Sequence, residues 1–130
     1  MKKESDAIVI AKPISYDQGE LGVVSKVSVL KTLKGKKFDE IYIYQVGNID
    51  ENNTILYGDV LELNKEYVLF LGKQSEGKDN EFYVKAGKQG AFLNENGKVK
   101  NKDKTMQDDI KNIHKDKKSE YESLLDAIEE

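Results

Sequence analysis

The sequence contains no cysteine, no arginine and no tryptophan, and it has only one proline and one histidine among its 130 residues. Without cysteine the chain has no disulfide framework, no thiolate metal site and no cysteine nucleophile. A single histidine excludes the metal sites that are built from several histidines. Because all 21 basic residues are lysines, the chain also lacks the guanidinium groups that bind phosphate in a bidentate manner.

The net charge is small and unevenly distributed. The 24 acidic residues exceed the 21 lysines by three, which gives a formal charge of −3. Residues 1–100 hold 15 lysines and 15 acids, whereas residues 101–130 hold 6 lysines and 9 acids, so the last thirty residues carry the whole excess. Nucleic acids and anionic membrane surfaces attract strongly basic proteins. We therefore expect neither as a partner.

Long apolar runs are also missing. No stretch approaches the ~20 apolar residues that span a bilayer, so we expect no transmembrane segment. The apolar run Ala7–Ala11 is too short for the apolar region of a secretory signal, and we interpret it as a buried strand. The length of the chain is typical of one domain.

The first hundred residues alternate apolar segments with polar turns, a pattern typical of β-strands. Pro13 is expected to end the first strand, because proline has no amide hydrogen to donate to a ladder. Asn96-Gly97 is typical of a tight hairpin turn. The pattern predicts strands at 7–12, 22–33, 40–46, 67–71, 81–86, 89–93 and 98–100, and loops at 14–22, 47–59 and 72–81.

The pattern changes to helical spacing after residue 100. Thr105 with Asp108, and Ser119 with Glu122, each resemble a capping box. Residues 105–130 therefore form one helix or two, and we favour two. We expect the apolar stripe of this segment to pack over one open end of an antiparallel barrel or curled sheet formed by residues 1–104; docking on a partner is the alternative. The stripe comprises Ile110, Ile113, Leu124, Leu125 and Ile128.

Sequence motifs for catalysis or metal binding are weak. The segment from Asp50 to Thr54 begins like a calcium-binding loop, but Ile55 stands where that loop needs glycine and Leu61 where it needs glutamate. His114, the one histidine, lies in a charged helical segment, and no serine lies in a nucleophile turn. We expect no catalytic residue, no metal site and no cofactor.

Aromatic residues on the predicted strands are the better candidates for a binding site. Barrels that bind single-stranded nucleic acid display aromatics in this way, but the neutral charge and the missing arginine argue against that ligand. Aromatics at strand spacing also commonly belong to the core. The candidate ligand-binding residues are two strand tyrosines and three residues of the 47–59 loop: Tyr42, Tyr44, Asp50, Asn52 and Tyr57.

Five segments have the pattern of a known kind of domain: 6–12, 27–35, 41–45, 63–71 and 87–92. Together they resemble uncharacterised secreted or lipid-anchored domains of Gram-positive bacteria, which are similar to the netrin-like and tissue-inhibitor-of-metalloproteinase barrels. With the helical spacing after residue 100, the resemblance implies a mainly β fold, a five- to seven-stranded antiparallel barrel of the oligonucleotide/oligosaccharide-binding (OB) type with a C-terminal helical appendage. It does not extend to the cysteine with which those inhibitors chelate a protease metal.

Three functions are compatible with these observations. The leading prediction is a non-enzymatic binding module that is extracellular or on the cell surface, with a protein or cell-envelope component as its partner and with its signal segment outside this sequence. The alternative is an inhibitor or regulator of an extracellular enzyme, in which the loop 49–57 inserts into a cleft of the partner. A hydrolase that uses carboxylates alone is the third. The oligomeric state stays open.

Overall fold

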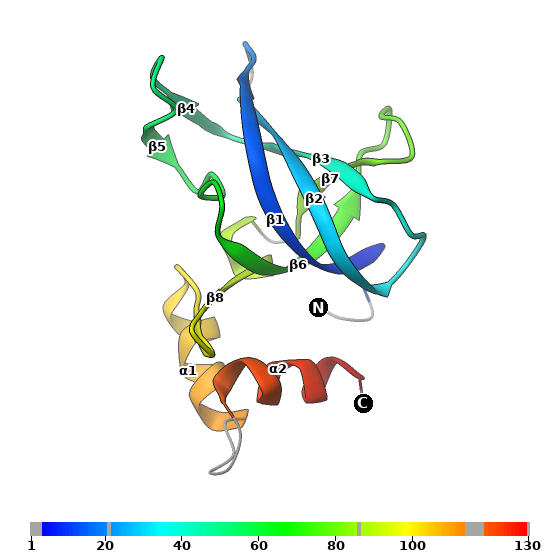
Figure 1. Ribbon diagram of the computed structural model, residues 1–130, viewed down its shortest axis with the longest axis vertical. Helices are drawn as coiled ribbons and strands as arrows, with labels where there is room; N and C mark the ends of the chain where they lie inside the picture. Colours follow the sequence, from blue (N-terminus) through cyan, green and yellow to red (C-terminus); the bar gives the residue numbers. More distant parts are fainter. Residues whose placement is uncertain (1–3, 21, 86, 114–118, 130) are drawn as a thin grey trace.

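The computed structural model describes residues 4–20, 22–85, 87–113 and 119–129. This part of the chain contains a long β-hairpin, a sheet that curls into a barrel, and two helices at the C-terminal end (Figure 1). The elements are β1 Ala7–Gln18, β2 Val23–Lys34, β3 Glu40–Gln45, β4 Gly47–Ile49, β5 Ile55–Gly58, β6 Glu66–Lys73, β7 Glu81–Val84, a 3-10 turn Gly87–Gly90, β8 Ala91–Glu95, β9 Lys98–Lys100, α1 Lys104–Ile113 and α2 Glu120–Glu129.

Five strands of the described chain close a barrel in the order β1-β2-β3-β7-β6, with β6 returning to β1. The pairings are antiparallel except for the parallel pair of β3 and β7. One edge of β6 is shared: Leu71–Lys73 pair with β7, and Glu66–Leu69 pair with β8, which carries β9. The predicted fold class, a small mainly β OB-like barrel with a helical appendage, is confirmed.

The wholly apolar runs of β1 and β6 are explained by burial on both faces. Side chains alternate across a strand, so Val9 and Leu69 enter the barrel interior, whereas Ile8 and Phe70 belong to a second cluster on the outer wall. That outer cluster also contains Leu124 of α2. The helices therefore cover the outer wall of the barrel, and the expectation that they close an open end is wrong.

Helix α2 is also tied to the free edge of β9. Ser119 caps the helix by accepting the Glu122 amide hydrogen at 3.1 Å, as the sequence pattern indicates. The Val99 amide donates to the Glu120 carboxylate at 3.0 Å, and the Gln107 side chain of α1 donates to the Val99 carbonyl at 3.0 Å. Two helical side chains thus satisfy backbone groups that an edge strand leaves unpaired.

Two predicted boundaries are wrong. β1 continues through Pro13 to Gln18, because its pairing with β6 ends at Ala11 and the strand is paired on one edge only where the proline stands. The expected loop 14–22 is therefore mostly strand, and its register with β2 shifts between Pro13 and Ser15. The expected loop 47–59 folds instead as the β4–β5 hairpin, which we call the ribbon.

Candidate functional site

Two of the predicted binding residues, Tyr44 and Tyr57, lie together on the outside of the barrel, where they line one hollow with Val46 and Tyr83. We call these four residues the tyrosine surface. Tyr44 belongs to β3, and Val46 comes directly after that strand. Tyr57 belongs to β5 and Tyr83 to β7. Their side chains stay accessible, with 39% of Tyr44, 74% of Val46, 59% of Tyr57 and 37% of Tyr83 exposed. Clustered exposed apolar side chains on a small protein are typical of an interaction site.

Two hollows meet at this surface. The first has a volume of about 350 Å³ and is lined by all four members together with Asp59 and Gly87. The second has a volume of about 560 Å³ and extends from Tyr44 and Val46 to the turn between β1 and β2, where it reaches Glu20. Tyr44 and Val46 therefore form a ridge between two adjoining depressions.

Tyr83 owes its position to a glycine on the neighbouring strand. In the β6–β7 pairing, Gly72 lies directly opposite Tyr83. A Cβ atom added to Gly72 would lie 2.3 Å from Cζ and 2.5 Å from the hydroxyl oxygen of Tyr83, much closer than a van der Waals contact. The phenol ring thus covers the space above Gly72, an arrangement known from aromatic residues paired with strand glycines.

The ribbon is fixed at its base by close packing and by side-chain amides, and this places Tyr57. Gly58 has a φ of +94°, and a Cβ there would lie 2.4 Å from the Val46 carbonyl oxygen, so the position requires glycine. The Gln45 side chain donates to the Asp59 carbonyl at 2.8 Å and accepts from the Leu61 amide at 3.0 Å. The ribbon therefore holds a defined place against β3.

Hydrogen bonding and charge shape the Tyr44 end of the surface. The Tyr44 hydroxyl donates to the Glu81 carboxylate at 2.6 Å. This bond lowers the pKa of Glu81 and raises the pKa of Tyr44 from their ordinary values, since it stabilises the carboxylate and retains the phenol proton. At the other end, the Lys85 ammonium lies 5.9 Å from the centre of the Tyr83 ring, within the range of a cation–π contact.

The other predicted site residues lie elsewhere. Tyr42 is half-buried on β3 and does not line either hollow. Asp50 and Asn52 belong to the turn at the tip of the ribbon, where the Asp50 carboxylate accepts the amide hydrogens of Asn52 at 2.8 Å and Thr54 at 2.9 Å. This is an Asx turn, which explains the calcium-like spacing of oxygen side chains without a metal.

His114 lies outside the described residues, as do the side chains of Ile110 and Ile113. Within the part of the chain that the structure describes, no group of three or more His, Asp or Glu side chains is arranged to hold a metal ion. The described helices are too short and too polar to cross a membrane.

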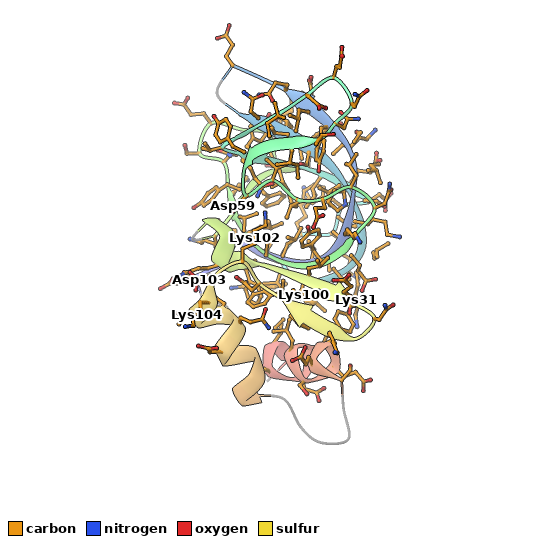
Figure 2. All side chains as sticks on the ribbon, turned by 90° about the vertical axis from the view of Figure 1, so that its left-hand side faces the viewer. Lys31, Asp59, Lys100, Lys102, Asp103 and Lys104 are labelled. Carbon is orange, nitrogen blue, oxygen red and sulfur yellow. The ribbon has the colours of Figure 1, made fainter. Side chains whose placement is uncertain are left out.

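A third hollow, of about 210 Å³, lies beside β8 and β9 and has Leu61, Tyr67 and Leu93 among its lining residues. Lys102 and Asp59 lie 3.9 Å apart at this hollow and are neighbours in Figure 2. Burial raises the pKa of Tyr67 to about 12, and its hydroxyl oxygen accepts the Glu62 amide at 3.0 Å. The polar groups here hold the fold together, so this hollow is a weaker candidate than the tyrosine surface.

Sequence reasoning missed Val46 and did not select Tyr83. Val46 stands at the end of an alternating strand, where one exposed apolar residue is ordinary. Tyr83 is aromatic on a predicted strand, but its meeting with Gly72 depends on the register of β6 and β7, which are separated by a polar loop. A glycine at the end of an apolar strand is the one sequence signal for an aromatic partner.

No protein-family model matches the chain, and no curated protein is significantly similar to it.

Proposed function

We propose that this protein is a non-enzymatic binding module that acts outside the cell or at its surface, and that it binds a protein or another cell-envelope component at the tyrosine surface. The observation that carries the proposal is the convergence of Tyr44, Val46, Tyr57 and Tyr83 around two adjoining hollows. Tyrosine offers a large, rigid contact area and a polar tip, and such residues dominate binding energy at interfaces. The resemblance to secreted and lipid-anchored Gram-positive domains supports the proposed location.

The proposal is tested by co-sedimentation with purified cell walls and by pull-down from secreted proteins of a Gram-positive bacterium. We expect wild-type protein to be retained and Tyr57→Ser to be released at concentrations where wild type stays bound. Leu30→Ser is the matched control, because Leu30 is 53% exposed and lies away from the tyrosine surface. Equal retention of wild type and Tyr57→Ser would refute the assignment of the site.

The second candidate is an inhibitor or regulator of an extracellular enzyme, and the ribbon favours it. The ribbon projects from the barrel beside β1 (Figure 1), and Leu56 on β5 is 61% exposed. Insertion of the ribbon into a cleft would bury Leu56, whereas docking on the tyrosine surface would bury Tyr83. Leu56→Ser and Tyr83→Ser therefore separate the two candidates: the first variant abolishes binding by insertion, and the second weakens binding at the surface.

A further inference from the structure

The charged side chains that line the two hollows of the tyrosine surface are both acidic. Glu20 lies in the larger hollow, and Asp59 lies in the smaller one. A third carboxylate, Glu81, is bonded to the hydroxyl of Tyr44. Glu81 is ionised at neutral pH, as glutamates ordinarily are, and its bond to Tyr44 lowers its pKa further. Asp59 lies 3.9 Å from the Lys102 ammonium, so the larger hollow, at Glu20, is the more attractive of the two for a cationic ligand.

The aromatic rings of the tyrosine surface also attract cations. The negative face of a phenol ring attracts an ammonium group, and the molecule already shows this contact, since the Lys85 ammonium lies 5.9 Å from the Tyr83 ring centre. Tyr57 is more exposed than Tyr83. Its ring is accessible to an ammonium from another molecule.

The size of the hollows suits a long aliphatic side chain. A water molecule takes about 30 Å³ of liquid, so the hollows of about 350 and 560 Å³ each hold on the order of ten waters or more that a ligand would displace. The methylene stem of a lysine covers apolar surface while its ammonium stays near carboxylates. Val46, at the ridge, is the apolar partner for such a stem.

On these three grounds we propose that the ligand of the tyrosine surface is a lysine-bearing extended peptide segment of a partner protein. The stems of its lysines cross Val46, and its ammonium groups lie over the exposed Tyr57 ring and beside Glu20. This inference rests on the proposed function, because it specifies the ligand of the same surface.

The test measures binding of fluorescein-labelled decalysine, decaglutamate and maltohexaose by fluorescence anisotropy. We expect decalysine alone to bind, and we expect its affinity to fall when salt is raised to roughly 0.3 M, because added ions screen exposed charges. Tyr57→Ser should weaken the binding of decalysine about two- to fivefold, the ordinary contribution of one exposed cation–π contact. Circular dichroism checks that each variant is folded.

Glu20→Gln and Glu51→Gln form a matched pair for charge. Both remove one exposed negative charge, but Glu20 lines the larger hollow and Glu51 lies near the tip of the ribbon. We expect Glu20→Gln to weaken decalysine binding and Glu51→Gln to leave it unchanged. Absence of decalysine binding, or an equal effect of the two variants, would overturn the inference.

The outcomes also separate this inference from the proposed function. If maltohexaose binds in a manner that depends on Tyr57 and decalysine does not bind, the ligand class is wrong and the binding surface stands. If none of the three probes binds and cell-envelope material is retained equally by wild type and Tyr57→Ser, both the ligand class and the surface are wrong.

Discussion

Replacement of Gly72 by alanine tests how the tyrosine surface is built. The new Cβ would lie 2.3 to 2.7 Å from three atoms of the Tyr83 side chain, whereas carbon atoms in contact lie about 3.5–4.0 Å apart. The ring must therefore move by about 1 Å or more. Overpacking of a core costs about 1–3 kcal/mol. Tyr83 is 37% exposed and the atoms that the new Cβ meets lie at the end of its side chain, so the ring can turn aside and we expect Gly72→Ala to lower the free energy of unfolding by about 1 kcal/mol.

A double-mutant cycle isolates the cause. The three heavy atoms nearest the added Cβ all belong to Tyr83, so a Tyr83→Ala background removes the closest contacts of the new methyl group. There, Gly72→Ala should be neutral or should stabilise by up to about 1 kcal/mol, because glycine in a strand is entropically unfavourable. Urea unfolding of wild type, both single variants and the double variant gives the coupling energy, which we expect to exceed about 1 kcal/mol.

Equal destabilisation by Gly72→Ala in the two backgrounds would refute this reasoning. That result would mean that Tyr83 does not occupy the space above Gly72, and that another part of the barrel resists the added methyl group.

Three further predictions concern the scaffold. Gly90→Val should lower the melting temperature more than Gly77→Val, because a Cβ at Gly90 would lie 2.6 Å and 2.9 Å from two backbone carbonyl oxygens. A Cβ at Gly77 would meet only side-chain atoms of Gln74 and Glu81 at its nearest contacts, and equal melting temperatures would contradict this prediction. Leu124→Ala should cost about 2–5 kcal/mol in urea unfolding, because Leu124 is buried against the outer wall of the barrel, and half-buried Leu125→Ala should cost clearly less. The pKa of Tyr67 is raised to about 12 chiefly by burial, so the stability it contributes is complete below pH 10 and is lost as pH rises from 10 through about 12. Tyr67→Phe should make that part of the stability profile less steep, while Tyr121, whose pKa is also raised to about 12, keeps part of the slope. An unchanged slope would count against burial as the cause.

The strand pattern was predictable from sequence because burial on both faces leaves a continuous apolar run. Ala7–Ala11 and Tyr67–Leu71 are such runs, and both are paired strands of the barrel wall. The cap of α2 was equally local, since Ser119 and Glu122 are three residues apart.

The stability cost of a substitution at Gly77 was not predictable in this way. From the sequence alone we expect no loss of stability there, but the structure places the Gln74 Cβ atom 2.8 Å from an added Cβ. That cost is expected to be smaller than the cost at Gly90.

The remaining features depend on contacts between distant segments. Pro13 fits within a strand because the partner on one side has already ended there, which no local pattern shows. Tyr44 and Tyr57 were predicted from the sequence as binding residues. Tyr83 joins them because of the register between β6 and β7. Val46 joins them because Gly58 packs closely against the Val46 backbone. Asp50 and Asn52 were selected because their oxygen-bearing side chains have the spacing of metal ligands. In the structure the Asp50 carboxylate accepts the Asn52 amide hydrogen within a turn.

Hydroxyl-radical footprinting with mass spectrometry tests the tyrosine surface most directly, because it reports which side chains a bound ligand covers. The protein is labelled alone and in the presence of the cell-envelope or secreted fraction that retains it. We expect oxidation of Tyr44, Tyr57 and Tyr83 to fall on binding, and oxidation of the exposed Leu30 and Ile14 to stay the same. Unchanged oxidation of the three tyrosines, with protection of Leu30 or Ile14, would contradict the proposed site.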